Sequence, residues 1–357
     1  MTKPKDRIVS HKVWISFLTV GVLIALGGIG VAPHVAKTVY VKGEPIEEEV
    51  VPKKTEAPKL DTALYDRKML MLANVSSTTA TSTREMWPVK APYPKAGAIL
   101  PFKRIIAYYG NFYSTKMGVL GEYPEDVMLE KLRQEKRNWE AADPATPVMP
   151  AINYIAITAQ SLPGRENKYM LRMPDTEIDK AIEIAKKVDG IVILDIQIGF
   201  STLQYELPLL EKYLAMPQVH LGLDPEFHMI GSETPGHVIG SYDAADINYA
   251  SNYMAELVRK HNLPPKVLIV HRFTQRMVTN YQNITPLPEV QVVMDMDGWG
   301  PPAKKINTYK AFIFPEPVQF AGFKIFYKND LKPPSTRLLT PADLLELTPR
   351  PIFIQYQ

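Results

Sequence analysis

Acidic side chains end several short apolar runs of this 357-residue sequence, at a spacing that could support catalysis. The runs end Leu194-Asp195-Ile196-Gln197, Leu223-Asp224-Pro225-Glu226, Val270-His271-Arg272 and Met294-Asp295-Met296-Asp297. If each run is a strand, side chains two positions apart share a face, so five carboxylates and His271 would point the same way. Burying such charges uncompensated is costly, so they must bind a metal, pair with bases such as Arg272, share protons or meet a polar substrate.

This pattern favours glycoside hydrolysis, which uses one carboxyl group with a raised pKa as the acid and one ionised carboxylate as nucleophile or base. We expect Glu226 to be the general acid and Asp295 or Asp297 to be the nucleophile or base. Asp224 completes the catalytic set by tuning the local charge. The residues expected to bind substrate, by hydrogen bonds or by stacking on sugar rings, are Asp195, Gln197, His271, Arg272, Tyr109, Trp299 and Tyr327.

Two other functions fit the same residues. The first is metal-assisted hydrolysis, because carboxylates and His271 could hold a hard divalent ion. The chain has only seven histidines and no His-x-His or His-Glu-x-x-His motif, so zinc is not expected and no cofactor is predicted beyond an optional divalent metal. The second is a non-catalytic envelope protein that binds a glycan or a partner. Serine hydrolases and P-loop ATPases are disfavoured because their Gly-x-Ser-x-Gly and Walker motifs are absent.

The elements that must position these residues are predicted from residue 104 onward. Runs typical of strands cover residues 105–111, 148–157, 190–197, 219–226, 266–272, 290–297, 319–327 and 351–356. Helical patterns cover residues 124–142, 174–188, 203–215, 244–261, 274–283 and 341–347. Eight alternating units in about 255 residues match an α/β fold of the (β/α)₈ TIM-like barrel type, with the active site at the carboxyl ends of the strands.

Two alternatives to this assignment stay open. A doubly wound open sheet is the other fold, although no Gly-x-Gly-x-x-Gly turn follows the first predicted strand. The seventh strand could instead be residues 311–314, which would place Glu316 at a strand end as a candidate nucleophile.

An uncharged apolar segment at residues 13–32 is long enough to cross the roughly 30 Å hydrocarbon core as a helix. Lysine and arginine are in excess before it, which favours a cytoplasmic N-terminus. A cleaved signal peptide is the alternative, and either reading exports the rest of the chain. The predicted order is a cytoplasmic tail at 1–12, a transmembrane anchor at 13–32, a low-complexity stalk at 33–100 with a short helix near 63–74, and an extracytoplasmic barrel at 101–357, at the cell surface or in the periplasm.

The composition limits the possible partners and chemistry. Hydrophobic residues make up 46% and charged residues 22%, as expected of a globular domain with a sizeable core. The net charge of +3 is too small to indicate a nucleic-acid partner. The absence of cysteine excludes disulfides, thiolate metal sites and cysteine nucleophiles. The expected partners are therefore the membrane and a glycan or another polar ligand of the envelope.

From about Arg104 to Gln357 the chain resembles an exported bacterial TIM-barrel group of unknown function. The segments that carry the resemblance are Ala107-Tyr108-Tyr109-Gly110, Leu223-Asp224-Pro225-Glu226-Phe227, Val270-His271-Arg272-Phe273-Thr274-Gln275-Arg276 and Phe326-Tyr327-Lys328-Asn329-Asp330. The resemblance implies an extracytoplasmic barrel and no particular activity. The chain is similar to glycosidases in layout only: Gln197 follows Asp195 where chitinase-like barrels carry glutamate, and Pro225 precedes Glu226 where many cellulase-like barrels carry asparagine.

Overall fold

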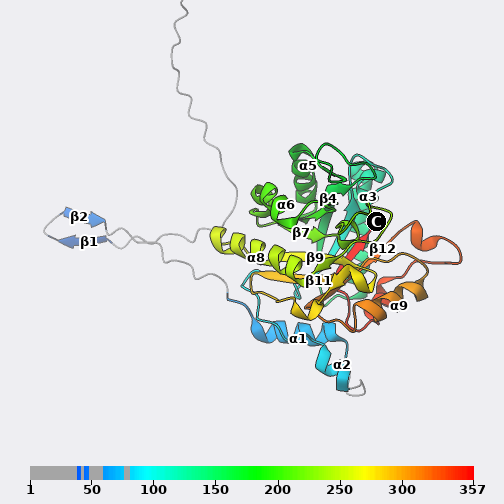
Figure 1. Cartoon of the computed structure of the whole chain (residues 1–357). Helices are drawn as coiled ribbons and strands as arrows, with labels where there is room; N and C mark the ends of the chain where they lie inside the picture. The colour runs from blue at the N-terminus through cyan, green and yellow to red at the C-terminus, as the bar shows by residue number, and fades with distance from the viewer. Residues whose placement is uncertain (1–37, 42–43, 48–58, 76–80) are drawn as a thin grey trace, which may run out of the picture. The chain divides into compact units, whose positions relative to one another are not determined.

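The computed structural model describes residues 38–41, 44–47, 59–75 and 81–357 (Figure 1). The predicted tail and membrane helix at residues 1–32 lie outside the described residues. Among the residues that are described, no helix is long and apolar enough to cross a membrane. The chain divides into two compact units, Met1–Glu56 and Ala57–Gln357. In the first unit β1 (Thr38–Val41) and β2 (Glu44–Glu47) form an antiparallel hairpin within the region predicted to be a stalk.

Eight parallel strands of the second unit close into a barrel. Their order around the ring is β3-β13-β12-β11-β9-β7-β6-β4, and β4 pairs back onto β3. The strands are β3 (Arg104–Gly110), β4 (Val148–Ala159), β6 (Ile191–Ile196), β7 (Val219–Leu223), β9 (Lys266–Arg272), β11 (Val290–Met296), β12 (Phe320–Ile325) and β13 (Phe353–Tyr356). The predicted barrel is confirmed and the open sheet is wrong, because the ring has no unpaired edge. A short additional strand, β5 (Met170–Arg172), pairs antiparallel with the end of β4.

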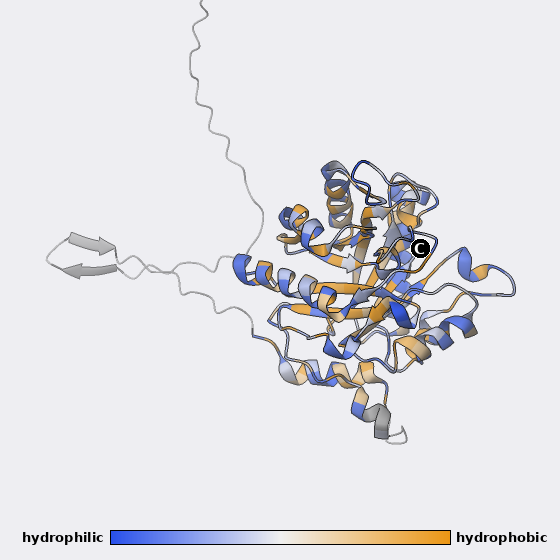
Figure 2. Cartoon of the chain, viewed as in Figure 1, coloured by the Kyte–Doolittle hydropathy of each residue, from blue (hydrophilic) through white to orange (hydrophobic). Residues whose placement is uncertain are grey.

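Helices surround the barrel, as Figure 1 shows for α5, α6, α8 and α9 around the central strands. The helices that follow the first strand are α3 (Val119–Glu122), α4 (Glu125–Ala142), α5 (Asp175–Lys186), α6 (Leu203–Leu209), α7 (Glu211–Leu214), α8 (Ala244–His261), α9 (Pro302–Phe312) and α10 (Pro341–Leu345). Short 3-10 turns are η1 (Pro225–Phe227), η2 (Gln275–Met277), η3 (Tyr281–Asn283) and η4 (Asn329–Leu331). Figure 2 shows the strands mostly hydrophobic and the helices mixed with hydrophilic residues, as expected where one helix face meets solvent.

Two predicted elements differ from the structure. The helix predicted at residues 274–283 is instead η2, the two-residue strand β10 (Val278–Thr279) and η3; Asn280, with φ of 54°, takes the left-handed conformation that interrupts a helix. β10 pairs with β8 (Tyr242–Asp243). The alternative seventh strand at residues 311–314 is wrong, because α9 runs through Phe312 and β12 supplies the strand.

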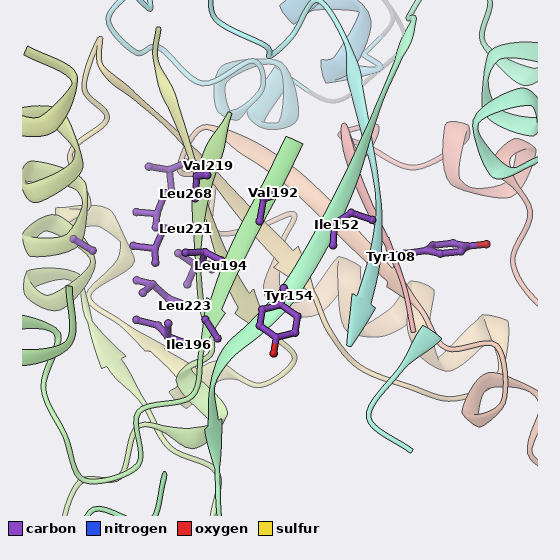
Figure 3. Packing of buried hydrophobic residues seen from close by; sticks show 14 of the residues in the cluster. Tyr108, Ile152, Tyr154, Val192, Leu194, Ile196, Val219, Leu221, Leu223 and Leu268 are labelled. Carbon is purple, nitrogen blue, oxygen red and sulfur yellow. The ribbon is translucent and has the colours of Figure 1, made fainter. Parts of the chain in front are cut away.

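The barrel core has two layers because successive strand residues face opposite ways. On β6, Val192, Leu194 and Ile196 point outward toward the helices, and Figure 3 shows them beside outward residues of neighbouring strands such as Leu221. The inward side of the same strand begins with Ile191, which belongs to the second, interior layer. The polar residues at the strand ends continue this inward face, so the alternation of the strands decides which side chains reach the barrel mouth.

Helix α1 (Thr62–Ala73) covers the end of the barrel at which the strands begin. Its buried Tyr65, Met69 and Leu72 belong to the interior layer together with Ile105 and Phe320, near the starts of β3 and β12. The helix occurs near the position predicted, but the surrounding residues 59–75 and 81–100, which include α2 (Thr81–Met86), belong to the barrel unit rather than to a free stalk. The alternation of apolar residues in this stretch is too sparse to reveal that it packs against the barrel.

Candidate active site

A pocket of about 560 Å³ opens where the barrel strands end. Six of the residues predicted to act or bind line it: Tyr109, Gln197, Asp224, Glu226, Asp297 and Trp299. They come from β3, from the ends of β6, β7 and β11, and from the turns that follow β7 and β11. The carboxyl ends of barrel strands are where active sites of this fold class lie, so the pocket is the candidate active site.

A fully buried histidine joins two aspartates beneath the pocket. The imidazole Nε2 of His271 lies 2.6 Å from Asp195 Oδ2, and its Nδ1 lies 3.1 Å from Asp295 Oδ2. Burial alone would lower the pKa of His271, but the charge of Asp195 and hydrogen bonds to both aspartates raise it well above the usual value. Burial tends to raise the pKa of Asp195, yet the charge of His271 brings it below the usual value. Burial raises the pKa of Asp295.

Glycines on the neighbouring strands make room for these aspartates. A Cβ atom on Gly222 would lie 2.7 Å from Asp195 Oδ2, and one on Gly322 would lie 2.6 Å from Asp295 Oδ1. The register places Gly222 beside Asp195 and Gly322 beside Asp295. The same register places Asp295 beside His271 on the other neighbouring strand. Strand pairing therefore fixes the depth at which the histidine and aspartates meet.

Asp297 lies one layer closer to the pocket, between two cationic groups. Its Oδ1 is 3.0 Å from the Nζ of Lys324, and its Oδ2 is 3.5 Å from the Nδ1 of His271. Lys324 is itself buried and sits 3.9 Å from the centroid of the Tyr109 ring. Asp297 therefore forms an ion pair with Lys324 at the wall of the pocket.

Asp224 and Glu226 form a second acidic pair, in which the pKa values of both carboxyl groups are raised. Asp224 accepts hydrogen bonds from Gln197 Nε2 at 3.0 Å and from the backbone N–H of Glu226 at 3.1 Å. Burial raises the pKa of Asp224 to about 7. Burial, followed by repulsion from Asp224, raises the pKa of Glu226 to about 8. Glu226 therefore holds a proton at neutral pH while facing the pocket.

Three of the predicted site residues lie below the pocket and do not line it. Asp195, His271 and Asp295 are fully buried, so no substrate can reach them through the pocket described here. Asp295 was one of the two candidates for nucleophile or base, and its depth leaves that role to Asp297. Besides burial, which raises the pKa of Asp224, the charge of His271 lowers that pKa and the charge of Asp195 raises it.

Arg272 and Tyr327 lie away from the pocket, so we remove both from the set of predicted substrate-binding residues. Arg272 follows His271 on the same strand and points the other way, where its Nη1 is 2.5 Å from Glu316 Oε2. The hydroxyl of Tyr327 donates to Glu135 Oε1 at 2.7 Å, on the outside of the barrel. Glu316, whose place at a strand end depended on the rejected seventh strand, is thus the partner of Arg272.

Sequence reasoning missed several residues of the pocket. Lys324 is the most important, because it is the ion-pair partner of Asp297. A lysine at an inward position of the apolar run Phe320-Ala321-Gly322-Phe323-Lys324-Ile325 was the available signal. Lys116, Lys304 and Gln357 also line the pocket, and they come from loops, from the unpredicted α9 and from the last residue of the chain.

Among the described residues, no group of three or more histidine, aspartate or glutamate side chains is arranged to hold a metal ion. The carboxylates at the barrel mouth are instead accommodated by His271 and Lys324 or by retained protons.

No protein-family model matches the chain, and no curated protein is similar to it. Among solved structures, the chain is similar to dihydropteroate synthase from Burkholderia cenocepacia, complexed with 7,8-dihydropteroate, at 11% identity and a TM-score of 0.35, over 72% of this chain and 86% of that one. It is similar to the Bacillus subtilis mannanase BCman at 10% identity and a TM-score of 0.34, over 72% and 81%. It is similar to GH26C from Muricauda sp. MAR_2010_75 at 11% identity and a TM-score of 0.31, over 82% of each chain. At these TM-scores the likenesses carry no argument about function, and the barrel rests on its strand pairing.

Proposed function

We propose that this chain is a membrane-tethered glycoside hydrolase that acts outside the cytoplasm on an envelope or extracellular glycan. One observation carries the proposal: Glu226, whose pKa is raised to about 8, and Asp297, which is paired with Lys324, line the same pocket. Glycoside hydrolysis uses two carboxyl groups with different roles, and an acid with a raised pKa in one pocket with an ion-paired aspartate fits that requirement.

The proposed roles follow from these surroundings. Glu226 donates its proton to the glycosidic oxygen as the bond from that oxygen to the anomeric carbon breaks. Asp297 either bonds to the anomeric carbon, or takes a proton from a water that attacks that carbon and so gives inversion. In the first case a glycosyl-enzyme forms, and a water deprotonated by Glu226 then displaces Asp297 from the carbon, which gives net retention and releases the sugar. Trp299, which is partly exposed, offers its indole to a sugar, and Tyr109 and Gln197 line the pocket as buried groups.

The location is supported by the sequence rather than by the fold. The apolar segment at residues 13–32, with basic residues before it, is the proposed anchor. The chain between the anchor and the barrel unit would let the pocket reach a polymer fixed in the envelope.

The proposal is tested by measuring the rate of glycan hydrolysis with the wild type, Glu226→Gln and Asp297→Asn. Both variants should still bind the glycan but lose activity by roughly 10²–10⁴-fold, the usual contribution of a positioned acid or base. Glu233→Gln is the matched control, because Glu233 is an exposed glutamate that does not line the pocket. It should retain wild-type turnover.

The pH profile is a second readout of the same roles. Wild-type kcat should fall as the pH rises through about 8, because Glu226 then loses the proton that it must donate. This alkaline fall should be absent from the residual activity of Glu226→Gln. Equal turnover by wild type and Glu226→Gln would overturn the role assignments. Binding of glycans by the wild type without hydrolysis of any would favour the non-catalytic binding protein.

A further inference from the structure

The rim of the pocket carries lysines without acidic partners. Lys116 and Lys304 line the pocket, and Lys332 lies beside it at Trp299. All three are exposed, and within the described residues none of them forms an ion pair. Nearby, Lys324 pairs with Asp297 and Lys328 pairs with Glu122. Acidic groups therefore lie in this region, but they do not pair with the three rim lysines.

Two of these lysines flank an exposed tryptophan. The indole of Trp299 is 46% exposed, and the Nζ atoms of Lys304 and Lys332 lie 5.2 Å and 5.0 Å from a Trp299 ring centroid. The turn that holds the indole is anchored, because the backbone N–H of Gly300 donates to Asp330 Oδ1 at 2.9 Å. Asp330 is buried and also pairs with Lys305 at 2.7 Å. The bond between Gly300 and Asp330 thus ties the turn that holds the indole to the segment that leads to Lys332.

The inside of the pocket does not offset this positive charge fully. Asp297 is already paired with Lys324, and Glu226 holds a proton at neutral pH. An anionic ligand would therefore meet unpaired ammonium groups at the rim, while the third carboxyl group inside, Asp224, is held by hydrogen bonds from Gln197 and from the Glu226 N–H. Two ammonium groups beside a partly exposed indole suit a sugar that bears acidic substituents, because they can pair with its charges while the exposed part of the indole contacts the sugar.

A second depression extends the site. It has a volume of about 520 Å³, and Gln160 lines both it and the pocket, so the two adjoin. Arg165 lies on its wall, is exposed and forms no ion pair within the described part of the chain. Exposed Leu162 and Leu171 provide apolar contact area there. A chain of several sugars could contact cationic groups both at Trp299 and at Arg165.

We propose that the ligand of this site is an anionic polysaccharide, whose acidic groups are bound by Lys304 and Lys332 beside Trp299 and whose chain continues toward Arg165. Hydrolysis of this ligand would rest on the proposed function, whereas binding of the ligand does not depend on it. The acidic groups can be carboxylates, sulfates or phosphates, since the lysines would attract each of them.

The inference is tested by titration calorimetry, which measures the affinity of the full-length protein for polysaccharide probes. The protein carries Glu226→Gln to prevent turnover. The probes are polygalacturonate with its carboxyl-reduced form, chondroitin sulfate with its desulfated, carboxyl-reduced form, and poly(glycerol phosphate) with glycerol. At least one anionic probe should bind more than tenfold tighter than its neutral counterpart, and the probe that does so identifies the acidic group. Added salt should weaken that binding, because exposed charges are screened.

Adding Lys304→Gln and Lys332→Gln to this protein should lower its affinity for the anionic probe roughly tenfold, because two exposed charge contacts are lost. Its affinity for the neutral probe should change less than twofold. Lys310→Gln is the matched control: it removes an exposed lysine of α9 that does not line the pocket, and it should leave both affinities unchanged. Equal affinity for every anionic probe and its neutral counterpart would overturn the inference. So would an equal loss in the Lys310→Gln control.

Failure of this inference differs from failure of the hydrolase proposal. Selective binding of an anionic glycan, with no hydrolysis of any glycan by the wild type, would retain the ligand class and overturn the hydrolase. Hydrolysis of neutral glycans, with no preference for an acidic one, would retain the hydrolase and overturn the ligand class.

Discussion

At the mouth of the barrel, the acidic side chains avoid an unpaired charge in several ways. Asp195 and Asp295 share the imidazole of His271, and Asp297 pairs with Lys324. Glu226 instead keeps a proton, because burial raises its pKa. A buried charge left without a partner is costly, so these arrangements couple the chemistry of the site to the stability of the fold.

Replacing His271 tests the buried network. His271→Gln should lower the free energy of unfolding by about 3–5 kcal/mol near pH 6, because two buried aspartates lose their cationic partner. The folded-state pKa of His271 is raised, so its contribution is fully present below the unfolded value near 6.5 and is lost as pH rises through the folded value. The effect measured by urea unfolding should therefore shrink at alkaline pH. The exposed His237, changed to glutamine, should alter stability by less than about 0.5 kcal/mol. An unchanged urea midpoint in His271→Gln would contradict the network.

Glu226 should reduce the stability of the wild type at alkaline pH. Its pKa is raised from 4.5 to about 8, so stability present below pH 4.5 is lost as pH rises through about 8, where the folded protein must ionise a partly buried group. Glu226→Gln cannot ionise, and its melting temperature should exceed that of the wild type by about 2–4 °C at pH 8 and by little at pH 4.5. Thermal melts across this range measure the difference. A constant difference at all pH values, or one shared by Glu233→Gln, would argue against a partly buried, protonated Glu226.

At the scale of elements, α1 closes the barrel at the end opposite the pocket. Asp61 caps its first turn by accepting a hydrogen bond from the Leu64 N–H at 2.8 Å. At its other end, the carbonyl of Leu72 accepts from the Arg350 N–H at 2.7 Å, and Asn74 donates to the Leu347 carbonyl at 2.9 Å. A helix tied at both ends and buried along one face is part of the folded barrel rather than part of a linker.

Two substitutions on α1 separate burial from helix propensity. Met69→Ala should cost about 2–5 kcal/mol, because it leaves a cavity against the barrel interior. Leu70→Ala should change stability by less than about 0.5 kcal/mol, since Leu70 is 58% exposed on the same helix. Denaturant unfolding of both variants measures the contrast. Equal small effects would indicate that α1 does not pack against the barrel in solution.

At the scale of the whole molecule, the compact unit that holds the site begins at Ala57. A chain of residues 57–357 should fold with the melting temperature and glycan affinity of the full-length protein, because the site and α1 both lie within it. It should also stay in the soluble fraction, whereas the full-length protein should sediment with membranes. Cell fractionation and thermal melts measure both properties. Full-length protein in the soluble fraction with an intact N-terminus would contradict the anchor, and an N-terminus beginning within residues 33–37 would indicate a cleaved signal peptide.

Local patterns in the sequence predicted seven of the barrel strands without an alternative, together with the face on which their polar end residues lie; the seventh strand, left open between residues 319–327 and 311–314, was decided by the structure. Runs of β-branched and aromatic residues define a strand locally, and alternation defines its two faces, so neither requires knowledge of distant contacts. These properties were enough to bring Asp224, Glu226 and Asp297 to one pocket. They also show why Arg272, next to His271, faces away, although the prediction did not apply the alternation to it.

The depth of each inward residue and the partner that it meets depend on contacts that form only in the folded barrel. Alternation is the same for Asp295 and Asp297, yet the register with β9 and β12 buries the first against His271 and leaves the second at the pocket beside Lys324. The burial of α1 likewise depends on a surface assembled from the starts of several strands. The depth of an inward residue, its partner and its pKa depend on the stagger of the strands and on contacts between residues far apart in the chain. Local sequence patterns do not contain this information.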